Sequence, residues 1–247
     1  MTKIFFDHTY TIDDNFLLFK RMKEFGFYLS DKISDHPSSK SRFIYFKNGK
    51  YIEFVSYSEP MKKWWYLSGL SFGVDSSLKK FSRLSRFEHL GPAYSHRNYN
   101  WKENNSDYLP GWNFLSFKKL GIRTFYPWFT EYEKGRRKIP KGVNHPNGIN
   151  EFQGNLFRVN PKGQEFFELL FKRKIKDKME LIDGTWLYFK PGKTNRHEAI
   201  ILRANSTSRA QVILKESKLV KTHGIDLYLL DYPNRYKNCW KVGIICP

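Results

Sequence analysis

The stretch "DHPSSKSRFIYFKNGKYIEFVSY", residues 35–57, contains the clearest turn in the chain and a carboxylate in an unusual place. Asn48-Gly49 lies between two aromatic and β-branched runs, which predicts a hairpin with strands over 42–47 and 50–57. Glu53 lies in the middle of the second strand. An unpaired carboxylate among such apolar residues costs free energy unless a partner or a function offsets the cost. Glu53 is therefore a candidate site residue, with a salt bridge to lysine or arginine as the alternative.

The hairpin completes a unit that begins at the amino terminus. Residues 3–12 alternate polar and apolar side chains and predict a strand, and residues 13–25 predict a helix that stops at Gly26. A further strand is expected over 28–33. The first 60 residues are therefore predicted to have the order β-α-β-β-β.

Strand parity groups the side chains of this unit, because successive residues point to opposite faces of a sheet. In the first strand the residues expected to share one face are Ile4, Phe6, His8 and Tyr10. In the fourth strand they are Tyr51, Glu53, Val55 and Tyr57. A site role for His8 competes with the alternative that it is a hydrogen-bonded histidine of the core.

The same order of elements recurs along the chain. Residues 61–140 predict a second unit with a long loop near 91–110, and residues 141–247 predict a third, strand-rich and altered unit. In the third unit Pro161 is expected to begin a helix. Its expected strands lie near 152–159, 180–190, 198–204, 210–215, 225–231 and 240–246. These tandem units predict an α+β fold.

Composition limits the classes of function. The 247 residues are 40% hydrophobic and 18% aromatic, which is sufficient for a packed core, and no apolar run approaches the roughly 20 residues of a membrane span. The amino terminus does not have the pattern of a signal peptide, so a cytoplasmic protein is expected. The net charge of +19 attracts anions, and nucleic-acid binding remains a less favoured alternative because the basic residues are spread along the chain.

Five short motifs in order resemble the glyoxalase-like domain of the vicinal oxygen chelate superfamily, which includes glyoxalases, bleomycin resistance proteins and extradiol dioxygenases. They are Asp7-His8, His36-Pro37, Tyr51-Ile52-Glu53, Pro127 to Tyr132, and His145-Pro146-Asn147-Gly148. The resemblance covers residues 3–160. The sequence departs from the family pattern after His36-Pro37, where a Gly-Thr is missing, and at Tyr132, where the family has Trp.

The resemblance implies curled mixed sheets around a cleft, with a divalent metal held by residues from the first and last strands of the units. His8, Glu53 and Glu131 would be the metal ligands and the catalytic groups. The first strand of the second unit offers Gly69, Leu70 and Ser71 and no histidine, so the set would have three ligands. The metal would be Zn, Fe, Mn, Ni or Mg. Acid–base catalysis by His8 with a carboxylate is the metal-free alternative.

The resemblance also implies substrate contacts for His36, Arg97, His145, Tyr10 and Tyr51. Arg97 would bind a substrate carboxylate through a bidentate pair. The expected function is binding of a small, oxygen-rich, anionic molecule with lyase, isomerase or dioxygenase chemistry. Non-catalytic binding of the resistance type is the alternative. A homodimer, turn-forming roles for the two His-Pro pairs, and a solvent-facing Glu131 also stay open.

Overall fold

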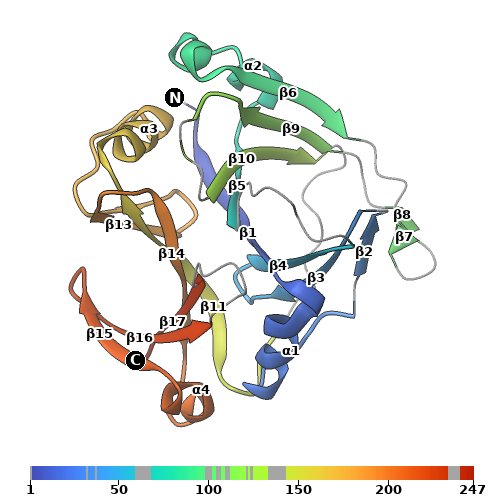
Figure 1. The fold of residues 1–247 in the computed structure, drawn as a ribbon, viewed down its shortest axis with the longest axis vertical. Helices are drawn as coiled ribbons and strands as arrows, with labels where there is room; N and C mark the ends of the chain where they lie inside the picture. The colour runs from blue at the N-terminus through green and yellow to red at the C-terminus, as the bar shows by residue number, and fades with distance from the viewer. Residues whose placement is uncertain are drawn as a thin grey trace.

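The computed structural model describes residues 2–31, 33–36, 38–58, 68–97, 102–103, 107–108, 112–120, 122, 125–132, 143–232 and 240–247. They form a mixed sheet of eight strands, another of seven strands and a two-stranded hairpin, with short helices between the strands. In Figure 1 the first sheet, blue to green, fills the upper and right part, and the second, yellow to red, the lower left. This architecture confirms the predicted α+β fold class.

Two β-α-β-β-β units build the eight-stranded sheet. The first consists of β1 (Ile4–Ile12), the 3-10 turn η1 (Asp14–Phe16), α1 (Leu17–Glu24), β2 (Ile33–His36), β3 (Ser39–Tyr45) and β4 (Tyr51–Tyr57). The second consists of β5 (Ser68–Val74), α2 (Leu78–Phe81), η2 (Ser85–Leu90), β6 (Pro92–Arg97), β9 (Trp112–Phe117) and β10 (Phe125–Tyr132). The small hairpin of β7 (Lys102–Glu103) and β8 (Asp107–Tyr108) lies within the second unit.

The strand order of this sheet is symmetric. The order β2-β3-β4-β1-β5-β10-β9-β6 is unchanged when the two units are exchanged, with β1 and β5 antiparallel at the centre. β4 runs parallel to β1, and β10 runs parallel to β5. Each position in the first unit therefore has an equivalent in the second unit.

The seven-stranded sheet also contains two units, where the sequence predicted one altered unit over 141–247. The first consists of β11 (Ile149–Val159), α3 (Pro161–Phe171), β12 (Lys178–Glu180) and β13 (Trp186–Pro191). The other consists of β14 (Arg196–Ala204), α4 (Gln211–Lys215), β15 (Lys218–Thr222), β16 (Ile225–Tyr232) and β17 (Trp240–Ile245). Residues 210–215 were expected to be a strand, whereas Gln211–Lys215 form the helix α4.

Several local predictions are confirmed. Gly49 closes the β3–β4 hairpin and Gly26 ends α1, each with a φ of +80° that favours glycine. The side chain of Asn160 caps α3, whose first residue is Pro161. The Asp13 carboxylate accepts hydrogen bonds from the amides of Leu18 and Phe19 at the start of α1.

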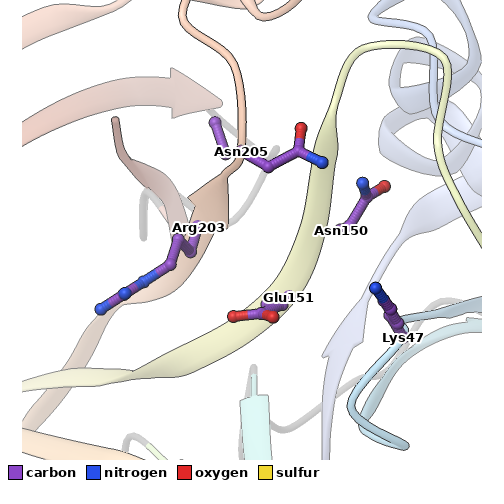
Figure 2. A pocket seen from close by; sticks show the side chains of 6 residues that line it. Lys47, Asn150, Glu151, Arg203 and Asn205 are labelled. Carbon is purple, nitrogen blue, oxygen red and sulfur yellow. The ribbon is translucent and has the colours of Figure 1, made fainter. Parts of the chain in front are cut away.

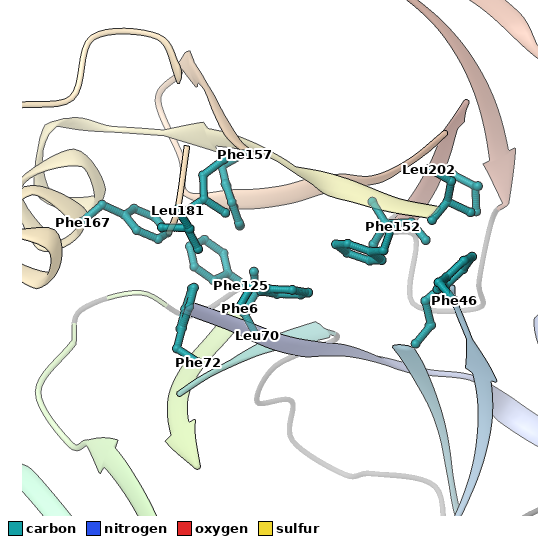
Figure 3. Close-up of a cluster of buried hydrophobic side chains, with 14 of the residues drawn as sticks. Phe6, Phe46, Leu70, Phe72, Phe125, Phe152, Phe157, Phe167, Leu181 and Leu202 are labelled. Carbon is teal, nitrogen blue, oxygen red and sulfur yellow. The ribbon is translucent and has the colours of Figure 1, made fainter. Parts of the chain in front are cut away.

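One aromatic core is shared by the two sheets (Figure 3). Phe6 of β1 stacks on Phe152 of β11 with ring centroids 4.9 Å apart. Phe125 of β10 contacts Phe157 of β11 with centroids 5.2 Å apart. One face of each sheet is thus buried against the other, and the opposite faces remain for other roles.

A buried ion pair also joins the sheets. Lys50, which is 2% exposed, contacts the Asp183 carboxylate and the carbonyl of Phe6. Asp183 also accepts a hydrogen bond from the Phe6 amide at 3.0 Å. The contact fixes the turn between β12 and β13 against β1. In the part of the chain that the structure describes, no helix is long and apolar enough to cross a membrane.

Candidate functional site

A β-bulge in β1 sets the position of His8. Phe6 pairs with Phe72 and His8 pairs with Ser71, so Asp7 is the extra residue in β1. Phe6 points into the shared core, whereas His8 lies on the opposite face of the first sheet, which we call the site face. The prediction that Ile4 and Phe6 share a face with His8 is therefore wrong, because the bulge shifts the alternation by one residue.

A row of four side chains crosses the middle of the site face. The strand registers place Tyr51, His8, Ser71 and Trp128 side by side on β4, β1, β5 and β10. Tyr10 and Glu53 form the adjacent pair. As the sequence predicted, His8, Tyr10, Tyr51 and Glu53 share this face.

His8 is held by two carboxylates. Its Nδ1 lies 2.7 Å from Asp7 Oδ2, and its Nε2 lies 3.4 Å from Glu53 Oε2. The imidazole stacks on Tyr51 with centroids 4.4 Å apart and meets the edge of Trp128. His8 is only 5% exposed, whereas the Glu53 side chain is 21% exposed. Glu53 is thus the more accessible of the two partners.

The charge state of His8 follows from these contacts. Burial by itself would lower the pKa of His8, but the hydrogen bonds and negative charges of Asp7 and Glu53 outweigh burial and raise that pKa. The protonated imidazolium is favoured as a result. It lies between two acidic groups in a mostly aromatic environment.

Tyr132 extends this arrangement. Its hydroxyl donates a hydrogen bond of 3.1 Å to Asp7 Oδ2 and lies 3.3 Å from the hydroxyl of Tyr51. Burial, together with the charge of Asp7, raises the pKa of Tyr132 well above its ordinary value. The phenol therefore keeps its proton and serves as a donor that fixes Asp7 beside His8.

The second unit contributes neutral groups at the equivalent positions. Ser71 pairs with His8 across the symmetric centre, and Thr130 takes the place of Glu53 two residues beyond the central row. Their hydroxyls lie 2.8 Å apart, and Trp128 Nε1 donates a hydrogen bond of 3.1 Å to Thr130 Oγ1. In this half of the site, uncharged side chains are hydrogen-bonded to one another.

The sequence predicted that Glu131 would lie beside His8 and Glu53. The structure does not bring these three residues together. Glu131 shares the face of β10 that carries Phe129, and its carboxylate accepts hydrogen bonds from Asn113 Nδ2 at 2.9 Å and from the amide of Leu78. Adjacent residues of a strand point to opposite faces, so Thr130 lies on the site face and Glu131 does not. Within the described ranges, no three His, Cys, Asp or Glu residues are grouped to hold a metal.

His145 lies in the core and not on the site face. Its Nδ1 accepts a hydrogen bond of 3.0 Å from the amide of Tyr28, and its ring packs against Phe27 and Phe46. Burial lowers the pKa of His145 to about 4, so the ring is neutral. These contacts support a structural role, which was the alternative to substrate binding.

The other predicted substrate contacts have different outcomes. Tyr10 and Tyr51 are on the site face, where the Tyr10 ring lies 5.3 Å from that of Trp128. His36 ends β2 and Arg97 ends β6, and both side chains lie outside the description that the structure gives. Sequence reasoning missed Tyr132 as a site residue, although its departure from the family pattern singled it out.

A hollow of about 140 Å³ lies elsewhere, between the β3–β4 turn and the second sheet (Figure 2). Its lining consists of Lys47, Asn150, Glu151, Arg203, Ala204 and Asn205. These side chains carry charges of both signs, and none belongs to the imidazole-centred group. The arrangement around His8 is therefore the stronger candidate for chemistry.

Comparison with known proteins establishes the fold. No protein-family model and no curated protein matches the chain. Similar solved structures include a hypothetical protein from Staphylococcus aureus, with 9% identity, a TM-score of 0.60, and coverage of 99% of this chain and 100% of that chain. At such low identity the likeness concerns the fold alone.

Two named enzymes are similar to the same degree. Homoprotocatechuate 2,3-dioxygenase from Arthrobacter globiformis has 10% identity and a TM-score of 0.58, with 97% of this chain and 79% of that chain covered. The Mn(II)-bound glyoxalase from Novosphingobium aromaticivorans has 9% identity and a TM-score of 0.60, with 99% and 83% covered. The resemblance predicted from the motifs is confirmed at the level of the fold.

Proposed function

We propose that this chain, whose fold is that of the vicinal oxygen chelate superfamily, binds a small oxygen-bearing molecule on the site face and moves a proton to or from it. The contact of His8 with both Asp7 and Glu53 carries this proposal. Charged groups in an aromatic environment are costly, and perturbed pairs of this kind are typical of functional sites.

The two nitrogens of His8 have different tasks. Asp7 occupies Nδ1 and is itself held by Tyr132, so the orientation of the ring is fixed. Nε2 faces Glu53 and is the nitrogen that can donate a proton or a hydrogen bond to a carbonyl or hydroxyl oxygen of a ligand. Glu53 is the accessible base that can accept a proton from the adjacent carbon.

The aromatic neighbours support a flat or small ligand. Tyr10 and Trp128 border the pair on one side and Tyr51 stacks on the imidazole. The net charge of +19 raises the local concentration of anions around the molecule. We therefore favour a small anionic hydroxy- or keto-compound, with proton transfer next to a carbonyl as the reaction of a lyase or isomerase.

Binding without chemistry is the second candidate function. The Ser71 and Thr130 hydroxyls bond to each other and offer no charged group from the second unit. A site whose charged groups all come from the first unit is consistent with a binding protein of the resistance type. In such a protein His8 and Glu53 would recognise the ligand and leave it unchanged.

Ligand-observed NMR in D₂O separates the two candidates. A panel of small hydroxy and keto acids is screened for binding, and carbon-bound protons of each ligand are followed for exchange. Proton transfer predicts exchange in the wild type and a loss of about 100-fold or more in Glu53→Gln, with ligand affinity changed less than tenfold. Binding alone predicts affinity with no exchange.

Glu131→Gln is the matched control, because that carboxylate lies on the opposite face of β10. It is expected to leave exchange and affinity unchanged. An equal loss in Glu131→Gln and Glu53→Gln, or no binding of any compound in the panel, would contradict the proposed site.

A further inference from the structure

We infer that the site face works without a resident zinc or divalent transition-metal ion, because two of the four positions at which this fold can hold a metal are the alcohols Ser71 and Thr130. The inference rests on the same residues as the proposed function. Metal binding is measured separately from ligand binding, so either proposal can fail alone.

The donor set is the first argument. The resemblance implies metal ligands on the first and last strands of each unit, and the symmetric strand order identifies the four positions as His8, Glu53, Ser71 and Thr130. Zinc and the divalent transition metals are held in proteins chiefly by imidazole, carboxylate and thiolate groups. Two of the four positions carry neutral alcohols, so the set does not fit a resident zinc or transition-metal ion.

The hydrogen bonds of the alcohols are the second argument. Thr130 Oγ1 accepts a hydrogen bond from Trp128 Nε1 and is bonded to Ser71 Oγ. Both residues are buried, and turning either hydroxyl toward a cation would break this chain. Turning Thr130 Oγ1 would leave the buried Trp128 Nε1 donor without its acceptor, which is unfavourable.

Close packing is the third argument. A Cβ placed on Gly69 would lie 2.3 Å from the ring of Tyr10 and 2.5 Å from that of Trp128. Aromatic rings therefore fill the site face directly beside the central row. The other ring nitrogen of His8, Nδ1, lies 2.7 Å from Asp7 Oδ2, so the imidazole is already held in place by a protein group.

The wild-type protein tests the inference directly. It is equilibrated with Mn²⁺ or Zn²⁺, desalted and analysed for metal, and its melting temperature is recorded with and without the ion. We expect less than about 0.1 ion per chain and no shift in melting temperature, because a ligand that binds only the folded state must stabilise it. One ion per chain that is lost in Glu53→Gln would overturn the inference.

A gain-of-function variant tests the position assignments. Ser71→His combined with Thr130→Glu supplies the two missing ligand types, and we expect it to bind one Mn²⁺ or Zn²⁺ at least about 100-fold more tightly than the wild type. The two single variants are the controls and should bind far more weakly. If the double variant keeps the circular dichroism of the wild type yet binds no ion, the assignment of the four positions is wrong. If it does not fold, the wild-type measurement decides alone.

Discussion

The site face of the first sheet has a counterpart on the second sheet with the same backbone layout. In β14, His197 pairs with Phe157 and Ala199 pairs with Leu156, so Glu198 is an extra residue, as Asp7 is in β1. The residue after the bulge is His8 in the first sheet and Ala199 in the second. The two sheets thus share a bulge at the same position but differ in the residue immediately after it.

The difference extends across the neighbouring strands. The parallel registers place Gly243 of β17 where β4 has Glu53, and the antiparallel registers place Leu156 where β5 has Ser71. The counterpart face is packed with a cluster consisting of Leu156, Tyr188, Ala199, Ile201, Leu227 and Leu229. One backbone arrangement therefore supports a polar site in one sheet and apolar packing in the other, and the side chains alone decide which.

The largest loss of stability is expected when a charged side chain replaces Leu156 on the apolar face of the second sheet. Leu156→Asp places an unpaired carboxylate among apolar side chains, and we expect the free energy of unfolding to fall by at least about 4 kcal/mol. Urea denaturation measures the change. Leu156→Met is the control and should cost less than about 1.5 kcal/mol. Equal stability of the two variants would show that the counterpart face is not a packed core.

Histidines in the core and on the site face should respond to pH in opposite directions. Burial lowers the pKa of His197 to about 3 and that of His145 to about 4, so their contribution to stability is complete above the unfolded pKa of about 6.5 and is lost as pH falls. The raised pKa of His8 gives a contribution that is complete below that value and lost as pH rises.

We expect the core histidines to dominate, with a fall of about 3 kcal/mol in the free energy of unfolding between pH 7 and pH 5. Asp13, whose pKa burial raises to about 6, offsets part of this fall. Denaturation at a series of pH values measures the slope, and His197→Gln should reduce it by about half. A slope unchanged in that variant would contradict the assignment.

The two bulge residues offer a matched pair of substitutions. Asp7 is 2% exposed and accepts hydrogen bonds from His8 and Tyr132, so Asp7→Asn should cost about 2 kcal/mol. Glu198 pairs with Arg158, whose side chain is 42% exposed, so Glu198→Gln should cost less than about 1 kcal/mol. Thermal denaturation of the two variants in one buffer measures both losses of stability. A larger loss in Glu198→Gln than in Asp7→Asn would contradict the prediction.

The smallest change in stability is expected at the proposed base. The Glu53 side chain is partly exposed, so Glu53→Gln should alter the free energy of unfolding by less than about 1 kcal/mol while it removes proton transfer. Urea denaturation of the variant checks this expectation. A loss as large as that of Leu156→Asp would mean that Glu53 serves the fold and not a ligand.

Much of the fold followed from local sequence signals, because turns and caps are short-range features. Asn48-Gly49 predicted the first hairpin and Pro161 predicted the start of α3. β6 was missed because it lies in a polar segment that resembles a loop. Helix α4 was missed because its Val, Ile and Leu residues also suit a strand.

The candidate site could be predicted only in part. His8 and Glu53 were identified because a motif and an isolated carboxylate are visible in the sequence. The prediction that Glu131 faces the site was wrong, because the face on which each β10 side chain lies could not be assigned without the register of that strand. The bulge at Asp7, which turns His8 away from the core, is a departure from regular alternation that depends on the neighbouring strand and leaves no local signal.

The aromatic core between the sheets has a practical consequence for anyone who wishes to reuse the first sheet as a scaffold. Phe6, Phe72 and Phe125 make part of their contacts with rings from residues beyond 148. A fragment that ends before β11 would expose these rings and would leave Lys50 without its carboxylate. The amino-terminal half is therefore not a portable module, and transplanting its chemistry into another protein requires moving both halves together.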